Sequence, residues 1–451
     1  MSERSRPTPT LSEARFSPEE LFFSTTDSHG RITSGNDVFT RISGYSSEDL
    51  MGSPHSIIRH PDMPRVVFQV LWDHIEANRP IAAYVKNMAV NGSFYWVLAL
   101  ASPIAGGYVS VRLKPAGKFF AVVRALYAEL RQTELQVESS GAGKKAAIEK
   151  SSDQLTAALK KLGYNSYEEL MHTVFVDEVR ERSRLLANRE VLSRAPPVSR
   201  REDVAVKRTE CRSLRREVNR LFTAVASFVD LDATLMDRAV FTTGLGRDVQ
   251  MLSMNAQVRA AGLADAGRTL KVIAEHMNRS AFIISSAAVD VSKYLRNVSL
   301  QLRETAFNVA AVELAVEMMD NFLAEIDASD VADISSATRA VSQLGDAAGR
   351  FLEFALQRIA SVAGIVRGLD DRLEDFLRQV RVLEILHVTG KTEAVRQPES
   401  HSVASIFETI RERAFEARQK LCDLATMVGS ARIRTPPSGA MAASLALLVA
   451  P

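Results

Sequence analysis

Apolar residues recur at intervals of three and four over the second half of the chain, from about residue 197 to residue 430. One such run comprises Cys211, Leu214, Val218, Leu221, Val225 and Phe228. A longer run extends from Val341 to Leu383 and departs from the spacing only once. A repeat of about 3.5 residues is typical of helices that bury one seam against each other. We therefore predict long antiparallel helices, packed as a coiled coil or a four-helix bundle.

The region from residue 19 to residue 115 has a different pattern, with short apolar segments separated by turn residues. The strand-like segments are residues 21–26, 31–33, 81–86, 94–101 and 108–113. Asn91-Gly92 falls between two of them, and this dipeptide is a common hairpin turn. The pattern predicts an α+β domain, in which an antiparallel sheet is flanked by short helices.

The remaining segments connect or flank these regions. Residues 116–196 predict a helical connector, because Phe119, Val123, Leu126 and Leu130 form an apolar helical stripe. Residues 197–330 and 331–430 each predict a helical hairpin. The ends, residues 1–18 and 431–451, have no such pattern and are predicted to be disordered tails.

Composition narrows the class of protein. The 451 residues include 56 basic and 54 acidic side chains, a net charge of +2, which gives no electrostatic drive toward nucleic acid. Two cysteines, Cys211 and Cys422, cannot build a disulfide framework. No apolar run approaches the roughly 20 residues that span a bilayer. We expect a cytoplasmic protein that has no membrane span and does not bind nucleic acid.

Motifs of the common enzyme classes do not occur in the sequence. It contains no P-loop, no His-Glu-x-x-His, no Gly-x-Ser-x-Gly and no Cys-x-x-Cys. A diguanylate cyclase module would need its own α/β domain, and residues 201–430 are predicted to be helical throughout. We therefore predict that the protein is not an enzyme.

Several motifs in the α+β region keep a fixed order and spacing. They are Asn36, the hexapeptide Arg59-His60-Pro61-Asp62-Met63-Pro64, Trp72, Lys86-Asn87, and Phe94-Tyr95-Trp96-Val97. Together they resemble a PAS sensor domain, and in particular the PAS domain of bacterial aerotaxis receptors. The resemblance covers about residues 18–115.

The resemblance implies a bound flavin whose redox state is the signal. Arg59, His60 and Asp62 lie on the motif that those receptors need for FAD. Three further residues match positions of the same pocket, namely Asn36, Trp72 and Asn87. An arginine pairs well with a phosphate or a reduced flavin, and a tryptophan packs on a ring. Ile81 departs from the family, which has tryptophan there.

Haem is the alternative cofactor, because related PAS domains bind it through an axial histidine. The imidazoles available for this role are His55, His60 and His74. A further alternative is a pocket without a cofactor, used only for binding a protein partner.

Residues 251–275 resemble the hairpin tip of methyl-accepting chemotaxis proteins. The family's tip docks a chemotaxis histidine kinase and its coupling protein. The matching tip positions include Asn255, Asp265, Gly267 and Arg268. Three positions depart: Arg259 replaces a glutamate, Gly262 replaces an arginine, and Ala264 replaces a glycine. The departures favour a hairpin that folds like a receptor tip but binds its partners differently, or not at all.

A second, weaker copy of the tip follows. Residues 252–262 align with residues 386–396, where Glu393 and Arg396 restore the glutamate and arginine that the first copy lacks. Two hairpins in one chain predict four arms, at residues 201–261, 267–325, 331–395 and 401–430. Such a chain would form the bundle alone, as a monomeric pseudo-dimer; a homodimer is the alternative.

These observations together predict a cytoplasmic signal transducer. Its PAS domain senses redox state or oxygen and passes the signal through the helix near Phe119 to a chemoreceptor-like bundle. The rival interpretation is a non-catalytic interaction scaffold that no longer controls a kinase.

Overall fold

The computed structural model describes residues 7–190, 201–262, 268–328, 334–396 and 401–430. Two compact units divide the chain. Within the described ranges, the first unit holds residues up to 223 together with residues 305–356, and the second holds residues 224–304 and 357–430. The long helices α7, α8 and α9 each contribute to both units.

The N-terminal part of the first unit is built on a five-stranded antiparallel sheet with the order β2-β1-β5-β4-β3. Its strands are β1 (Phe22–Asp27), β2 (Ile32–Gly35), β3 (Ile81–Met88), β4 (Phe94–Ile104) and β5 (Gly107–Leu113). The predicted α+β fold is confirmed. The predicted Asn91-Gly92 turn joins β3 to β4, and Gly92 has a φ of +84°, which glycine adopts without strain.

Short helices fill the connection between β2 and β3. They are α1 (Asp37–Ser43), α2 (Ser47–Leu50), the 3-10 helix η1 (His55–Ile58) and α3 (Arg65–Glu76). The N-terminus of α3 is capped from a distance, because the buried Glu134 carboxylate accepts hydrogen bonds from the Arg65 and Val66 amides at 2.8 and 3.0 Å. This contact fixes where α3 begins, and therefore where Trp72 lies.

Residues 7–18 differ from the disordered tail that was predicted. The Thr10 amide donates to the Gly92 carbonyl at 2.8 Å, and the Ala14 amide donates to the Phe94 carbonyl at 2.8 Å. Phe16 is buried and packs edge-on against Phe22. The segment lies alongside the start of β4, which supplies its hydrogen-bond partners. Its own polar sequence has no strand pattern, and this is why it was predicted to be disordered.

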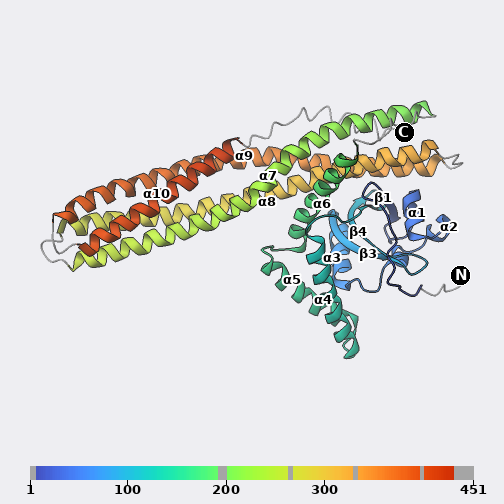
Figure 1. The fold of residues 1–451 in the computed structure, drawn as a ribbon, viewed down its shortest axis with the longest axis horizontal. Helices are drawn as coiled ribbons and strands as arrows, with labels where there is room; N and C mark the ends of the chain where they lie inside the picture. The colour runs from blue at the N-terminus through green and yellow to red at the C-terminus, as the bar shows by residue number, and fades with distance from the viewer. Residues whose placement is uncertain (1–6, 191–200, 263–267, 329–333, 397–400, 431–451) are drawn as a thin grey trace. The chain divides into compact units, whose positions relative to one another are not determined.

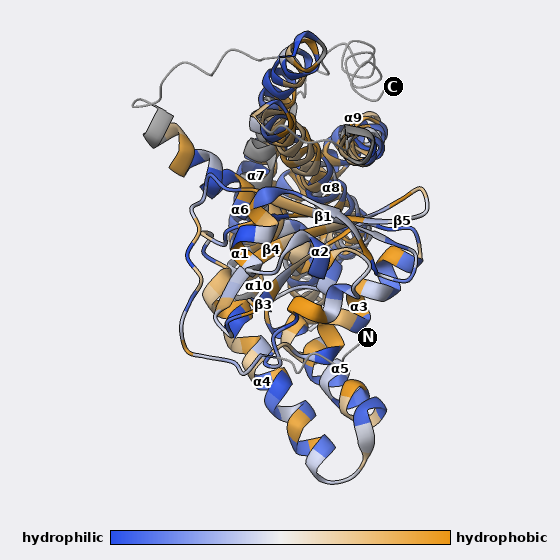
Figure 2. Cartoon of the chain, turned by 90° about the vertical axis from the view of Figure 1, so that its right-hand side faces the viewer, coloured by the Kyte–Doolittle hydropathy of each residue, from blue (hydrophilic) through white to orange (hydrophobic). Residues whose placement is uncertain are grey.

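The predicted connector consists of three helices: α4 (Phe120–Ser139), α5 (Gly143–Lys161) and α6 (Tyr167–Glu190). Helices α4 and α5 form a hairpin, and both alternate hydrophobic and hydrophilic positions, as expected of helices with one buried face (Figure 2). The Glu178 carboxylate on α6 accepts from the amides of Ala116 and Gly117 at 2.6 and 2.8 Å. It therefore holds the chain just after β5.

Four long helices follow: α7 (Glu202–Ala261), α8 (Arg268–Ala328), α9 (Ile334–Val395) and α10 (His401–Ser430). In the second unit, side chains from all four helices form one apolar core, and the helices run side by side (Figure 1). The predicted long-helix architecture is confirmed. Helices α7 and α9 end at Ala261 and Val395, two positions that the predicted repeat pairs.

In the first unit, every residue of α8 from Thr305 to Met319 is buried. A helix buried on all sides must have neighbours all round. Its partners there include α6, through Arg182 and Glu317; α7, through Asn219 and Glu313; and α9, through Phe351 and Phe307. This stretch of α8 is the central element of the first unit.

Candidate cofactor cavity

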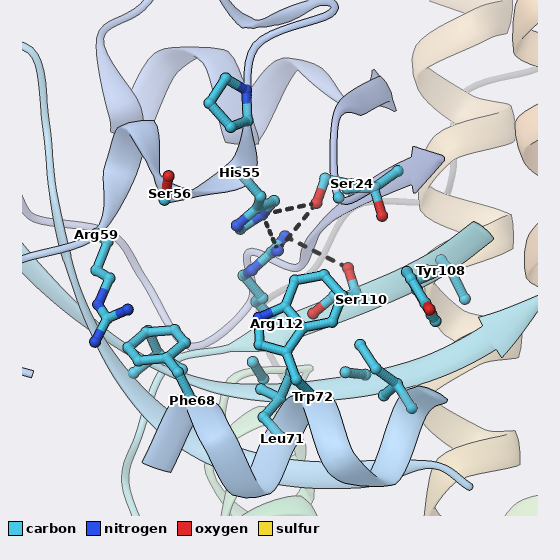
Figure 3. A pocket seen from close by; sticks show the side chains of 18 of the residues that line it. Ser24, His55, Ser56, Arg59, Phe68, Leu71, Trp72, Tyr108, Ser110 and Arg112 are labelled. Carbon is cyan, nitrogen blue, oxygen red and sulfur yellow. Dashed lines mark hydrogen bonds between the residues drawn. The ribbon is translucent and has the colours of Figure 1, made fainter. Parts of the chain in front are cut away.

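A cavity of about 290 Å³ lies between β5, β3, η1 and α3. Figure 3 shows its lining side chains, with Phe68, Leu71 and Trp72 rising from α3 on one side. The apolar part of the wall is Phe68, Leu71, Trp72, Ile75, Val85, Ala99, Ala101 and Val109. Its polar groups come from different elements and are Ser24, Thr26, His29, His55, Ser56, Arg59, Asn87, Tyr108, Ser110 and Arg112. Mostly apolar walls with a few polar groups are typical of small-molecule sites.

Three of the predicted cofactor residues line this cavity: Arg59, Trp72 and Asn87. The Arg59 guanidinium lies 3.7 Å from the centroid of the Phe68 ring. Asn87 is 2% exposed, and its side-chain amide nitrogen has no hydrogen-bond partner among the described residues. Because a buried donor without a partner is costly, a ligand acceptor is expected there.

Trp72 is held edge-on to Tyr108, with ring centroids 5.6 Å apart. The chain passes close to its indole at Gly30, where an added Cβ would lie 2.9 Å from the ring. Gly30 also has a φ of +73°, so a glycine fits the turn on both counts. These contacts hold the Trp72 indole in place as a flat part of the cavity wall.

The other three predicted cofactor residues do not line the cavity. Asn36 receives a hydrogen bond from the Phe23 amide at 3.2 Å and donates to the Leu21 carbonyl and to Glu325 at 3.2 and 3.1 Å. The His60 ring accepts from the Asp62 amide at 3.1 Å, and Asp62 is an exposed partner of Lys86 at 2.6 Å. These three residues instead bond to neighbouring parts of the protein.

Of the three histidines named for haem, only His55 lines the cavity. His60 and His74 are outside its lining, and one ring nitrogen of His74 lies 2.7 Å from the Val70 carbonyl oxygen. His55 does line the cavity, but its Nε2 lies 2.6 Å from an Arg112 nitrogen. An arginine is always a donor, so this Nε2 is an acceptor and is already used.

The cluster of Arg112, His55 and Ser24 was not predicted. Arg112 donates to Ser24 Oγ at 2.9 Å as well as to His55 (Figure 3). Desolvation of the ring, with the nearby Arg112 charge, lowers the pKa of His55 to about 3. Desolvation also lowers the pKa of Arg112 to about 10. The alternation of Tyr108, Ser110 and Arg112 along β5 was the available sequence signal, since alternate residues share one face of a strand.

The predicted tip residues lie at the ends of the long helices. Asn255, Arg259, Gly262 and Arg268 are exposed, and Asp265 and Gly267 lie outside the described residues. In the second copy, Arg396 is exposed and lies 3.5 Å from Glu393, its neighbour one helical turn earlier. The restored glutamate and arginine therefore pair with each other.

The fold and the cavity agree with the result of a family comparison, in which residues 32–111 match the family described as PAS fold. The region is a PAS sensor domain. Over 131 residues the chain is 37% identical to the aerotaxis receptor of Escherichia coli strain K12, a match that covers 28% of this chain and 26% of the receptor. The chain thus spans about a quarter of that curated relative.

The PAS domain is therefore aerotaxis-receptor-like, as its motifs predict, and the long helices fit a chemoreceptor-like region. A solved structure of a fungal LOV-domain photoreceptor is also similar, at 22% identity. That match covers 24% of this chain and 81% of the photoreceptor, with a TM-score of 0.19. Within the described ranges, no helix has an apolar stretch long enough to cross a membrane.

Proposed function

We propose that this protein is a cytoplasmic, non-enzymatic redox sensor that holds a flavin, most simply FAD, in the PAS cavity. The observation that carries the proposal is the cavity that joins Arg59, Trp72 and the unpartnered amide of Asn87. A flat apolar wall and a buried donor suit a heteroaromatic ring with a polar edge. The similarity to an aerotaxis receptor supports the same function.

The residues present fit a flavin better than a haem. The cavity offers an indole wall, an amide donor and two arginines, whereas its buried imidazole already accepts a hydrogen bond from Arg112. When bound, a flavin supplies a centre that accepts and releases electrons. Asn87 would hold the polar edge of the ring, Trp72 and Phe68 its apolar faces, and Arg59 a negatively charged group of the cofactor.

Strand β1 supplies the path from the cavity to the long helices within the first unit. Ser24 bonds Arg112 in the cavity, and its neighbour Phe23 packs edge-on against Phe322 of α8 with ring centroids 4.8 Å apart. Asn36 joins the Phe23 amide to Glu325, also on α8. We propose that a change at Arg112 is passed through β1 and Asn36 to α8. This path differs from the predicted one through the helix near Phe119.

The output is proposed to be the exposed tip of the long hairpins, acting on a chemotaxis histidine kinase and its coupling protein. A second candidate function is an interaction scaffold without kinase control. The specific observation that favours it is the exposed Arg259, which reverses the charge of the family's glutamate at the tip. A pull-down with purified kinase and coupling protein, with Arg259→Glu as the comparison, separates these two outputs.

The cofactor proposal is tested by the visible absorption spectrum of the full-length protein, as purified and after incubation with FAD. We expect flavin bands in the wild type, and their loss in Trp72→Ala and Asn87→Ala. Asp62→Asn is the matched control, because Asp62 belongs to the same motif but lies outside the cavity. Equal flavin content in all four proteins would reject the site assignment.

Transmission is tested separately with Asn36→Ala. Because Asn36 does not line the cavity, the variant is expected to keep its flavin. It should lose the difference between oxidised and reduced protein in hydrogen exchange of α8 around Glu325. Retained flavin with an unchanged difference in exchange would reject this path, and loss of flavin would instead place Asn36 in the cofactor site.

A further inference from the structure

Arg112 is a buried cation whose hydrogen-bond partners among the described residues are all neutral. It is 3% exposed and lies next to the last residue of β5, opposite Phe22 of β1. Its guanidinium donates to Ser24 Oγ at 2.9 Å, to His55 Nε2 at 2.6 Å and to the Ser110 carbonyl at 3.4 Å. Among the described residues, no carboxylate pairs with it. A buried charge without a counter-charge costs several kcal/mol in general.

His55 does not supply the missing negative charge, and the contact with Arg112 keeps it neutral. Its Nε2 accepts from Arg112, so its proton is on Nδ1. The ring is also stacked on Phe39, with centroids 6.3 Å apart and planes within 4°. The pair thus presents a fixed positive charge beside an imidazole that does not take up a proton near neutral pH.

Arg112, Ser24 and Ser110 all face the cavity (Figure 3). The fold therefore places an uncompensated cation where a ligand can reach it. A guanidinium in a water-poor site binds an anionic acceptor strongly, because the local dielectric constant is low. The missing counter-charge is best explained as one that arrives with the ligand.

We propose that Arg112 binds the negative charge that a flavin gains on reduction, so that the cavity binds reduced flavin more tightly than oxidised flavin. This inference rests on the proposed function. The oxidised ring is neutral; two electrons from a reductant and one proton leave it with one negative charge. A change of state can shift the protein only through such a differential interaction. Arg112 would supply it, and Ser24 connects Arg112 to β1.

The experiment measures the dissociation constants of oxidised FAD and of dithionite-reduced FAD for the full-length apoprotein, under anaerobic conditions. The wild type is expected to bind the reduced form at least tenfold more tightly. For a two-electron couple, a tenfold ratio corresponds to a reduction potential about 30 mV above that of free FAD. Arg112→Gln is expected to lose this preference by weakening the reduced complex, and Arg112→Lys to keep part of it.

Each outcome bears on one proposal. Equal or tighter binding of oxidised FAD by the wild type would overturn the role of Arg112, with no variant required. An unchanged ratio in folded Arg112→Gln would also overturn it, and Arg112→Met serves if the glutamine variant does not fold. In both cases flavin binding, and so the proposed function, would stand. Failure of the wild type to bind either form would reject the proposed function itself.

Discussion

Two arginines of the first unit are buried to the same extent and differ in what surrounds them. Arg182 and Arg112 are each 3% exposed. Arg182, on α6, forms a two-pronged ion pair with Glu317 of α8 at 2.7 and 2.9 Å. Arg112, on β5, has only neutral acceptors and a cavity. A buried charge with its counter-charge holds elements together, whereas we propose that the one without it marks where a charged ligand binds.

The largest effect is expected from breaking the paired arginine. Glu317→Gln leaves the Arg182 charge buried without its partner, and this should lower the free energy of unfolding by about 3–5 kcal/mol. Chemical denaturation followed by circular dichroism measures it. Arg184→Ala is the control, since Arg184 is on α6 like Arg182 but is exposed, and its ion-pair partner among the described residues is Glu181. Equal free energies of unfolding for the two variants would show that the buried ion pair does not stabilise the fold.

The neutral partner of Arg112, His55, should make the stability of the protein depend on pH. Its pKa is about 3 in the folded protein and about 6.5 when unfolded, so the unfolded chain binds the extra proton between these values. Its contribution to stability is therefore present above pH 6.5 and is lost as the pH falls toward 3. Between pH 6.5 and pH 5 the loss should be about 2 kcal/mol. Urea denaturation of His55→Gln, which does not titrate, should show a correspondingly smaller loss than the wild type.

Glu313 should produce a pH dependence of the opposite sign. It lies on the buried stretch of α8, where burial and then the nearby Glu317 raise its pKa to about 7. Asn219 donates to it at 3.0 Å, and Arg215 and Arg182 are the nearby cations. The folded state keeps the proton that the unfolded state loses, so stability falls as the pH rises from 4.5 to 7, by about 2–3 kcal/mol. Glu313→Gln should remove this fall in the same denaturation series; an unchanged slope would contradict it.

The long helices were predictable because their pattern is redundant. Each turn repeats the apolar spacing, so single departures do not hide the period. The helices accordingly end close to the predicted ends of the arms; α7 ends at Ala261 and α9 at Val395. The short N-terminal segment was not predictable, since residues 7–18 have no pattern of their own and depend on β4 for partners.

The candidate site was only half predictable. Arg59, Trp72 and Asn87 line the cavity as their motif implies, but the neighbouring His60 and Asp62 do not. His60 follows Arg59, and adjacent residues of an extended chain point in opposite directions, whereas Asp62 lies in the turn that comes next. Arg112 was missed because a single arginine on a strand looks like a surface residue in sequence. Its burial depends on Ser24 and His55, which are far away along the chain.

The central claim is tested most directly by thermal unfolding of Arg112→Met and Arg182→Met, each with and without saturating reduced FAD. Arg182→Met should keep the rise in Tm on adding flavin, because Arg182 lies outside the cavity lining. Arg112→Met should match or exceed the wild-type Tm without ligand, since it removes an uncompensated buried charge, and should lose most of the flavin-induced rise. A lower ligand-free Tm with an undiminished flavin-induced rise in Arg112→Met would contradict the account.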